Sequence, residues 1–525
     1  MKIVGRLSVT LVLLAGCCHA LAEDYEMRLR RAIEETPGKF RIVESKERWN
    51  PRETAVIVCD MWDLHHCKNA VVRANELAPR MNALLKAARD RGSLIIHAPS
   101  SCMPFYKDHP ARKRAQSAPE SGNIPEGIEQ WLTWLDKREE QAGYPIDHSD
   151  GGEDDDPKEH AEWAEKLRKM GLNPRAPWTR QMDLLEIDGG KDAITDSGRE
   201  NWNLLEQRGI RNVILVGVHT NMCVLGRPFG LRQMARNGKN VVLVRDLTDA
   251  MYNPAMPPRV SHFEGTDLIV NHVEKYVCPT VTSDQILGGA PHRFSGDLRK
   301  HIVFLIGERE YGTEKTVPRF VSENLTPSFR TTFVFADPEG ADRNKFHGIE
   351  ALTDADLLFV SVRRRALPEK DLKLVRDHIE KGKPVIGIRT ASHAFSLRGK
   401  PAPQGHAVWE EWDAEVIGGN YTGHHGNALT TEVRSTKEGL SFLGDERLPQ
   451  FTSGGSLYIN SPARPGQNVL LLGKAVGIER LEPLAWTFKR SDGGKTFYTS
   501  LGHVGDFEQA AFVKILRRAI QWCFE

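Results

Sequence analysis

The chain has 525 residues, of which 40% are hydrophobic and 27% charged, a balance that excludes long intrinsic disorder and a polytopic membrane protein. Lys and Arg number 71 against 70 Asp and Glu, so the formal net charge is +1 and no overall positive field exists to hold nucleic acid. We therefore expect a small-molecule substrate and no nucleic-acid partner.

The first 22 residues have the pattern of an export signal. Lys2 and Arg6 precede a short apolar run, which ends in the small residues Ala20 and Ala22 that signal peptidase requires. The run is too short for a membrane-spanning helix, which needs about 20 apolar residues, and nothing later reaches that length. We expect a signal peptide over 1–22, cleavage after Ala22 and a periplasmic or secreted protein without a membrane span. Lipidation of Cys17 is the alternative, because the residues before it resemble a bacterial lipobox.

A first block of alternating strands and helices begins at about residue 54. Continuous apolar runs indicate buried strands, and apolar residues at helical spacing indicate the helices between them. The expected strands are 55–58, 94–96, 213–216 and 241–244, and the expected helices are 77–88, 201–207 and one after Cys223. Such a pattern predicts an α/β domain, a doubly wound and mostly parallel sheet with helices on both faces, over 50–285.

A segment at about 100–185 interrupts this alternation. It contains four tryptophans, Trp131, Trp134, Trp163 and Trp178, and an acidic run at 153–156. A connection of this length is too long for an ordinary loop. We expect it to form a lid or wall at the carboxyl edge of the sheet; a solvated insertion or a contact in a homo-oligomer is the alternative.

A second block follows a predicted linker at 286–300. The expected strands are 302–306, 332–335, 357–360, 384–388 and 496–499, and the expected helices are 317–325, 368–380 and 512–523. This pattern predicts a second doubly wound α/β domain over 301–525.

Two strand ends of the first block carry reactive side chains. Asp60 follows the first strand, and Cys223 begins the helix that follows the strand at 213–216. A thiol at a helix N-terminus favours the thiolate, which is a nucleophile. A nearby carboxylate can take the thiol proton and return it to a leaving nitrogen. Lys191, which lies before the central strand, would keep that carboxylate ionised.

Residues from about 50 to 285 resemble the isochorismatase-like cysteine hydrolases, which include nicotinamidases and N-carbamoyl amidohydrolases. The resemblance is carried by AVIVCDMWD at 55–63 and NVILVGVHTNMCVLGRPFGLRQMARNGKNVVLVRD at 212–246. It implies a catalytic triad of Asp60, Lys191 and Cys223. It also implies a cis peptide between Val218 and His219, with the backbone N–H groups of His219 and Cys223 forming an oxyanion hole. The implied reaction is hydrolysis of a non-peptide C–N bond, in an amide or ureide, through a thioester-type intermediate on the cysteine.

Neither a metal nor a disulfide is decided by the sequence. No cofactor is required by the implied chemistry, but His65, His66, Asp108 and His109 could assemble a divalent metal site; loop histidines without a metal are the alternative. Export permits disulfides among the cysteines after the signal, and their spacing assigns none.

The second block contains a strand, a tight turn and a helix at 383–395, KPVIGIRTASHAF, which is nucleophile-elbow geometry. Class I glutamine amidotransferases carry a cysteine at this turn, where this chain has Arg389 and then Thr390. An arginine cannot act as a nucleophile, so we expect no covalent catalysis in this domain.

Residues 301–525 resemble instead the ThuA-like, or trehalose-utilisation-type, branch of that fold. The resemblance is carried by the elbow, by GGNYTGHHGN at 418–427 and by TFYTSLGHVGDF at 496–507. It implies a site at the strand edge for a carbohydrate-related ligand or a metal, with these candidate residues: Arg389, His393, His424, His425 and His503.

Two further hypotheses remain open. One is a non-catalytic ligand-binding or sensing protein built from two enzyme-derived folds, which would be favoured if Lys191 points to solvent, away from Asp60 and Cys223. The other is a metal-dependent sugar-modifying enzyme that uses the histidines of the second domain.

Overall fold

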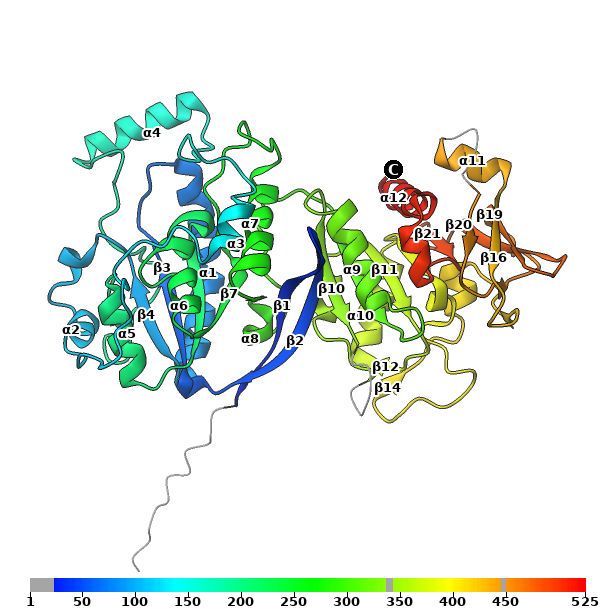
Figure 1. Cartoon of the computed structure of the whole chain (residues 1–525), viewed down its shortest axis with the longest axis horizontal. Coiled ribbons are helices and arrows are strands. Elements are labelled where there is room, and N and C mark those ends of the chain that lie inside the picture. The colour runs from blue at the N-terminus through cyan, green and yellow to red at the C-terminus, as the bar shows by residue number, and fades with distance from the viewer. Residues whose placement is uncertain (1–22, 337–342, 445–449) are drawn as a thin grey trace, which may run out of the picture.

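The computed structural model describes residues 23–336, 343–444 and 450–525. The expected signal peptide, Ala22 and Cys17 lie outside the described residues. Two lobes, each built on its own sheet with helices on both faces, lie side by side (Figure 1). The α/β class predicted from the sequence is confirmed, with mixed rather than purely parallel sheets.

The first lobe is built on an eight-stranded sheet of order β2-β1-β8-β7-β6-β3-β4-β5. From β8 to β5 the neighbouring strands are parallel, whereas β1 pairs antiparallel with both β8 and β2. The strands are β1 (Tyr25–Thr36), β2 (Lys39–Trp49), β3 (Thr54–Cys59), β4 (Leu94–Ala98), β5 (Ala193–Ile194), β6 (Asn212–Val218), β7 (Asn240–Asp249) and β8 (Thr280–Val281). The helices are α1 (Lys68–Asp90), α2 (Pro110–Gln116), α3 (Lys137–Ala142), α4 (Pro157–Lys169), α5 (Gly198–Gln207), α6 (Leu231–Arg236), α7 (His262–Tyr276) and α8 (Asp284–Leu287).

The second lobe is built on a nine-stranded sheet of order β10-β9-β11-β13-β21-β20-β19-β16-β17. The first five strands are parallel, and the last four are added antiparallel. The strands are β9 (His301–Gly307), β10 (Arg330–Phe335), β11 (Leu357–Val362), β13 (Val385–Ile388), β16 (Thr431–Ser435), β17 (Thr452–Ser453), β19 (Gln467–Ala475), β20 (Leu481–Lys489) and β21 (Lys495–Thr499). Two small ladders join β12 (Leu367–Pro368) to β14 (His406–Ala407) and β15 (Gly423–His424) to β18 (Tyr458–Ile459). The helices are α9 (Thr313–Asn324), α10 (Glu369–Glu380), α11 (Lys437–Leu443) and α12 (Ala510–Phe524).

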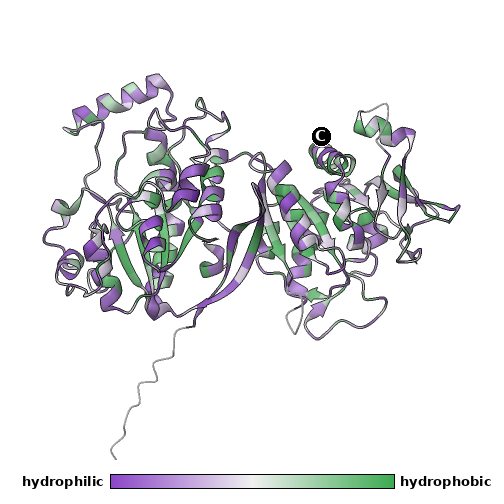
Figure 2. Cartoon of the chain, viewed as in Figure 1, coloured by the Kyte–Doolittle hydropathy of each residue, from purple (hydrophilic) through white to green (hydrophobic). Residues whose placement is uncertain are grey.

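Both faces of the central parallel strands of each sheet are buried, which is why these strands read as continuous apolar runs. Along β3, Ala55 and Ile57 join one core cluster and Val56 and Val58 join another, because successive side chains of a strand point to opposite faces. The apolar strands lie between helices whose outer faces are hydrophilic (Figure 2). This layering places the carboxyl ends of the parallel strands at one edge of each sheet, where ligands of such folds bind.

The hairpin of β1 and β2 lies between the two lobes (Figure 1). Its strand β1 extends the first sheet, and Ile42 of β2 joins the core cluster of the second lobe. The predicted first domain begins at residue 50, so this hairpin has no counterpart in the sequence-based prediction. The sequence pattern does not indicate these strands, because most of their exposed positions are charged and no long apolar run marks them.

Two properties bear on the cysteines and on membranes. Within the described part of the chain, all six cysteines (Cys59, Cys67, Cys102, Cys223, Cys278 and Cys523) are buried free thiols. Over the same residues, no helix combines the length and the apolar character that a membrane crossing requires.

Candidate functional site

Asp60 stands at the carboxyl end of β3 and is completely buried. Its backbone turns sharply out of the strand, with φ of 46°. One carboxylate oxygen, Oδ1, accepts a hydrogen bond of 2.7 Å from the backbone N–H of Ser100, which follows β4. The other, Oδ2, lies 3.0 Å from Nε of Arg227. The carboxylate is therefore fixed from two sides at the edge of the sheet.

Cys223 lies in a five-residue turn, Thr220–Val224, directly after β6, where its thiol and the Asp60 carboxylate are close enough to shift one another's pKa. The strands β3 and β6 approach closely at this point because Gly217 has no side chain. A Cβ at Gly217 would lie 2.0 Å from the carbonyl oxygen of Cys59, and its φ of 112° also favours glycine. The structure thus brings together the predicted nucleophile and the predicted carboxylate.

Lys191 is not part of this site, which corrects the predicted triad. Its side chain is 63% exposed, and its Nζ lies 3.9 Å from Asp188. The cause is the neighbouring residue, Asp192, which is buried and pairs with Arg89 at 2.7 Å and His97 at 3.2 Å. Because Asp192 points into the lobe, Lys191 faces solvent.

Arg227 supplies the cation that the prediction assigned to Lys191. Its side chain is 25% exposed, and its guanidinium lies 5.6 Å from the ring centroid of Trp131. Burial works against its charge, but the Asp60 carboxylate holds the pKa of Arg227 above its usual range. Sequence spacing could have indicated this residue, since Arg227 follows Cys223 by four positions, about one helical turn.

The protonation of the pair differs from the expectation of a resting thiolate. Burial, followed by the negative charge of Asp60, raises the pKa of the Cys223 thiol, and Arg227 only partly offsets this. Burial also raises the pKa of Asp60, while the charge of Arg227 and the groups of Cys223 and Ser100 beside the carboxylate oppose the shift. The expected stabilisation of the thiolate by a helix N-terminus is outweighed here. The helical segment is only one turn long, and the free-energy cost of desolvating the thiolate is larger than the stabilisation it can give. Both shifts favour the protonated, uncharged form, so the resting state of Cys223 is a thiol rather than a thiolate.

The peptide between Val218 and His219 is cis, as the sequence resemblance implied. His219 is buried, and burial lowers the pKa of its imidazole to about 3, so the ring is neutral. The ring is packed 4.8 Å from that of His65. The backbone N–H group of Cys223 belongs to the turn that carries the thiol, and that of His219 directly precedes this turn.

The inserted segment packs against this site. Trp178 stacks on Trp62, two residues after Asp60, with ring centroids 4.4 Å apart. Trp131 covers Arg227, and its backbone neighbour Leu132 donates a 2.9 Å hydrogen bond to the carbonyl of Gly226. The insertion therefore forms a wall of aromatic side chains beside the thiol and carboxylate, as the sequence predicted.

The metal site suggested by the sequence is not assembled. The rings of His65 and His66 lie 4.0 Å apart and are tilted by 34°, whereas Nδ1 of His109 accepts a hydrogen bond from the N–H of Ala111 at the start of α2.

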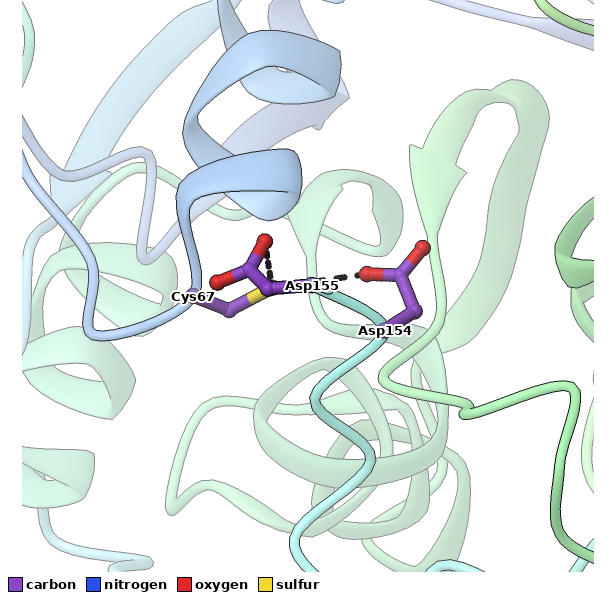
Figure 3. A group of neighbouring side chains, drawn as sticks. All are labelled: Cys67, Asp154 and Asp155. Carbon is purple, nitrogen blue, oxygen red and sulfur yellow. Dashed lines mark hydrogen bonds between the residues drawn. The ribbon is translucent and has the colours of Figure 1, made fainter. Parts of the chain in front are cut away.

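Within the described residues, a different group of potential ligands lies together: Cys67, Asp154 and Asp155 (Figure 3). Asp155 accepts the N–H groups of Lys68 and Asn69 at the start of α1, and both Asp154 oxygens accept from Arg73. These carboxylates already serve as a helix cap and an arginine partner, so the group does not fit a resident cation.

The elbow of the second lobe has the predicted geometry. Arg389 follows β13 with φ of 46° and begins the short turn Arg389–His393. A cavity of about 390 Å³ opens beside it, where the parallel strands β9, β11, β13 and β21 end. Of the five predicted residues, His393, His424 and His503 line this cavity, and Arg389 lies directly behind its lining.

His425 does not face this cavity, which corrects that prediction. Its Nε2 lies 3.5 Å from Glu482. Since β15 ends at His424, the two adjacent histidines point to opposite sides of an extended segment.

Comparison with known proteins supports the assignment of the second lobe. A family model described as "ThuA: Trehalose utilisation" matches residues 323–523. No curated protein matches the chain.

Solved structures similar to parts of the chain include ThuA-like and isochorismatase-family proteins. A putative ThuA-like protein from Bacteroides uniformis is 15% identical, with a TM-score of 0.33 over 45% of this chain and 95% of that one. A cysteine hydrolase from Pseudomonas syringae is 16% identical, with a TM-score of 0.28 over 45% of this chain and 92% of that one. An isochorismatase family protein from Desulfovibrio vulgaris is 15% identical, with a TM-score of 0.23 over 42% of this chain and 90% of that one.

Proposed function

We propose that the first lobe is a cysteine hydrolase that cleaves a C–N bond in an amide or ureide. The observation that carries the proposal is that Cys223 and Asp60 are buried and affect one another's pKa, with Nε of Arg227 lying 3.0 Å from the Asp60 carboxylate. A thiol with a carboxylate beside it is an arrangement that nucleophilic catalysis by cysteine can use, because the carboxylate can act as the general base.

In the proposed reaction, Asp60 takes the thiol proton as Cys223 attacks the carbonyl carbon. The resulting oxyanion is received by the N–H groups of His219 and Cys223. Asp60 then returns the proton to the leaving nitrogen, so that an amine or ammonia departs and a thioester on Cys223 remains. Water, activated by the same carboxylate, hydrolyses the thioester and regenerates the thiol. Arg227 keeps Asp60 ionised and takes no part in proton transfer.

The test is release of amine or ammonia from a panel of small amides and ureides. Cys223→Ser should fold normally and release none from any substrate that the parent cleaves. Arg227→Lys should keep part of the activity, because it preserves the charge. A parent inactive on the whole panel would remove the support for this proposal.

A non-catalytic binding protein is the second candidate, because the exposed position of Lys191 is what that hypothesis expects. The two candidates differ in Cys223→Ser: a binding protein should retain ligand affinity and show no turnover in either form.

We also propose that the second lobe binds a carbohydrate-related ligand in its cavity, and that the chain is exported. The first rests on the family match and on the three histidines that line the cavity. The second rests on the sequence of residues 1–22 alone. Fractionation of the producing cells tests export, and a substitution at Cys17 separates lipidation from cleavage after Ala22.

A further inference from the structure

The cavity of the second lobe has an unusual cation directly behind its lining. Arg389 is only 1% exposed, and its Nη1 donates to the carbonyls of Ser456 at 3.1 Å and Ser500 at 2.6 Å. Among the residues that the structure describes, Nε and Nη2 of the same guanidinium have no hydrogen-bond partner. Within the described ranges, no carboxylate forms an ion pair with it.

A buried guanidinium without a carboxylate is costly, because desolvation is repaid only by opposite charge and complete hydrogen bonding. The faces of Tyr311 and Tyr458 lie 4.1 Å and 4.7 Å from its Cζ and offset part of this cost. Arginine stays protonated in proteins, so the cost cannot be removed by loss of a proton. A negative charge in the adjacent cavity would complete the balance.

A single layer of residues separates the guanidinium from the cavity. Tyr311, Gly455, Ser456 and Tyr458 line the cavity and also contact or adjoin Arg389. A Cβ at Gly455 would lie 2.9 Å from Nη1 and 3.1 Å from Nη2, so the missing side chain leaves the charge close to the lining.

The rim of the cavity adds to this positive field. Arg363 and Arg398 line it, and within the described residues only Arg363 has a carboxylate partner, Glu310 at 2.8 Å. Burial and then the surrounding arginines lower the pKa of His393 to about 2. A neutral imidazole can both donate to and accept from a hydroxyl group.

One side of the cavity is aromatic. The ring of His393 stacks on Tyr421 at 4.4 Å, and Tyr421 lies 4.9 Å from Tyr458. Flat apolar faces beside polar groups suit a ring with one apolar face and several hydroxyls.

We propose that this cavity binds an anionic carbohydrate, a sugar that carries a carboxylate or a phosphate, with the anion directed toward Arg389 and the ring against Tyr421. The proposal deepens the carbohydrate-binding role proposed for the second lobe and depends on it.

The experiment is calorimetric titration of the full chain with glucuronate, glucose 6-phosphate and glucose. We expect at least one of the two anionic sugars to bind about tenfold or more tightly than glucose, and the stronger of the two identifies the anion. Arg389→Met should remove this preference, and Arg389→Lys should retain part of it. Arg490→Met is the matched control, because it removes another buried arginine of the same lobe, away from the cavity, and should leave the preference intact.

Three outcomes would overturn the inference. Equal affinity for glucose and both anionic sugars would refute the anion while leaving carbohydrate binding in place. No binding of any of the three would refute both this inference and the carbohydrate role. A preference that persists in folded Arg389→Met would refute the role of that guanidinium. If Arg389→Met does not fold, competition in the parent decides: inorganic phosphate should displace the anionic sugar, and failure to do so counts against the site.

Discussion

Replacing Arg227 should make the Cys223 thiol less reactive, whereas replacing Lys191 should leave the reactivity of that thiol unchanged. The guanidinium lies 3.0 Å from a fully buried carboxylate and lowers the pKa of both Asp60 and Cys223. A hydrogen bond to a charged group contributes about 1.5–3 kcal/mol. About 2 kcal/mol corresponds to about 1.5 pKa units. In Arg227→Met the thiol should therefore titrate at higher pH, and its alkylation at a fixed alkaline pH should slow by about tenfold to thirtyfold.

The assay is alkylation by iodoacetamide across a pH series, with modification of the Cys223 peptide measured by mass spectrometry. It needs no substrate. Lys191→Met is the matched control and should follow the parent profile. Asp60→Asn should shift in the opposite direction, toward faster alkylation, because the Asp60 charge raises the pKa of the thiol. Slower alkylation in Lys191→Met with an unchanged profile in Arg227→Met would refute this account of the site.

Three predictions concern stability. Burial raises the pKa of Asp413 from 3.8 to about 6. The protonated carboxyl therefore contributes about 3 kcal/mol to the free energy of unfolding, which is fully present below about pH 4 and lost as the pH rises through 6. In Asp413→Asn the free energy of unfolding in urea should vary less with pH over that range, and an unchanged pH dependence would contradict this. Glu139 of α3 and Arg232 of α6 form a fully buried pair at 2.7 Å; Glu139→Gln should cost about 3–5 kcal/mol in urea unfolding, and a loss below about 1 kcal/mol would show that the inserted segment is held otherwise. Gly217→Ala should lower the melting temperature sharply or prevent folding, because the new Cβ would overlap the Cys59 carbonyl; a normal melting temperature would mean that β3 and β6 can separate at little cost.

The sequence predicted the parts of the fold that bury both faces of a strand. Runs such as 55–58 and 213–216 are apolar at every position, and both appear as buried strands. The hairpin of β1 and β2 was missed because it mixes charged and apolar residues, and its partners are distant in sequence. The antiparallel strands β16, β19 and β20 are not indicated by the sequence either, because charged residues such as Glu432, Lys474 and Glu482 interrupt their apolar residues.

The sequence predicts those residues of the candidate site whose location depends only on their position at the end of a strand. Asp60 and Cys223 come together because the ends of adjacent parallel strands meet at one edge. Lys191 was chosen by resemblance, but which of two neighbouring residues faces inward depends on Arg89 and His97, which sequence does not place beside it. The protonation of Cys223 could not be predicted, because burial is a property of the packed lobe.

The hairpin at the start of the described chain makes the two lobes dependent on one another. Without it, β8 would become a free sheet edge open to pairing with another molecule, and α9 would lose an apolar neighbour in Ile42. A recombinant fragment that starts at residue 50 should therefore be prone to self-association, and one that starts at residue 301 should lack part of its own interior. Fragments cut at a boundary between the lobes would therefore lack the hairpin that both lobes need for a complete fold.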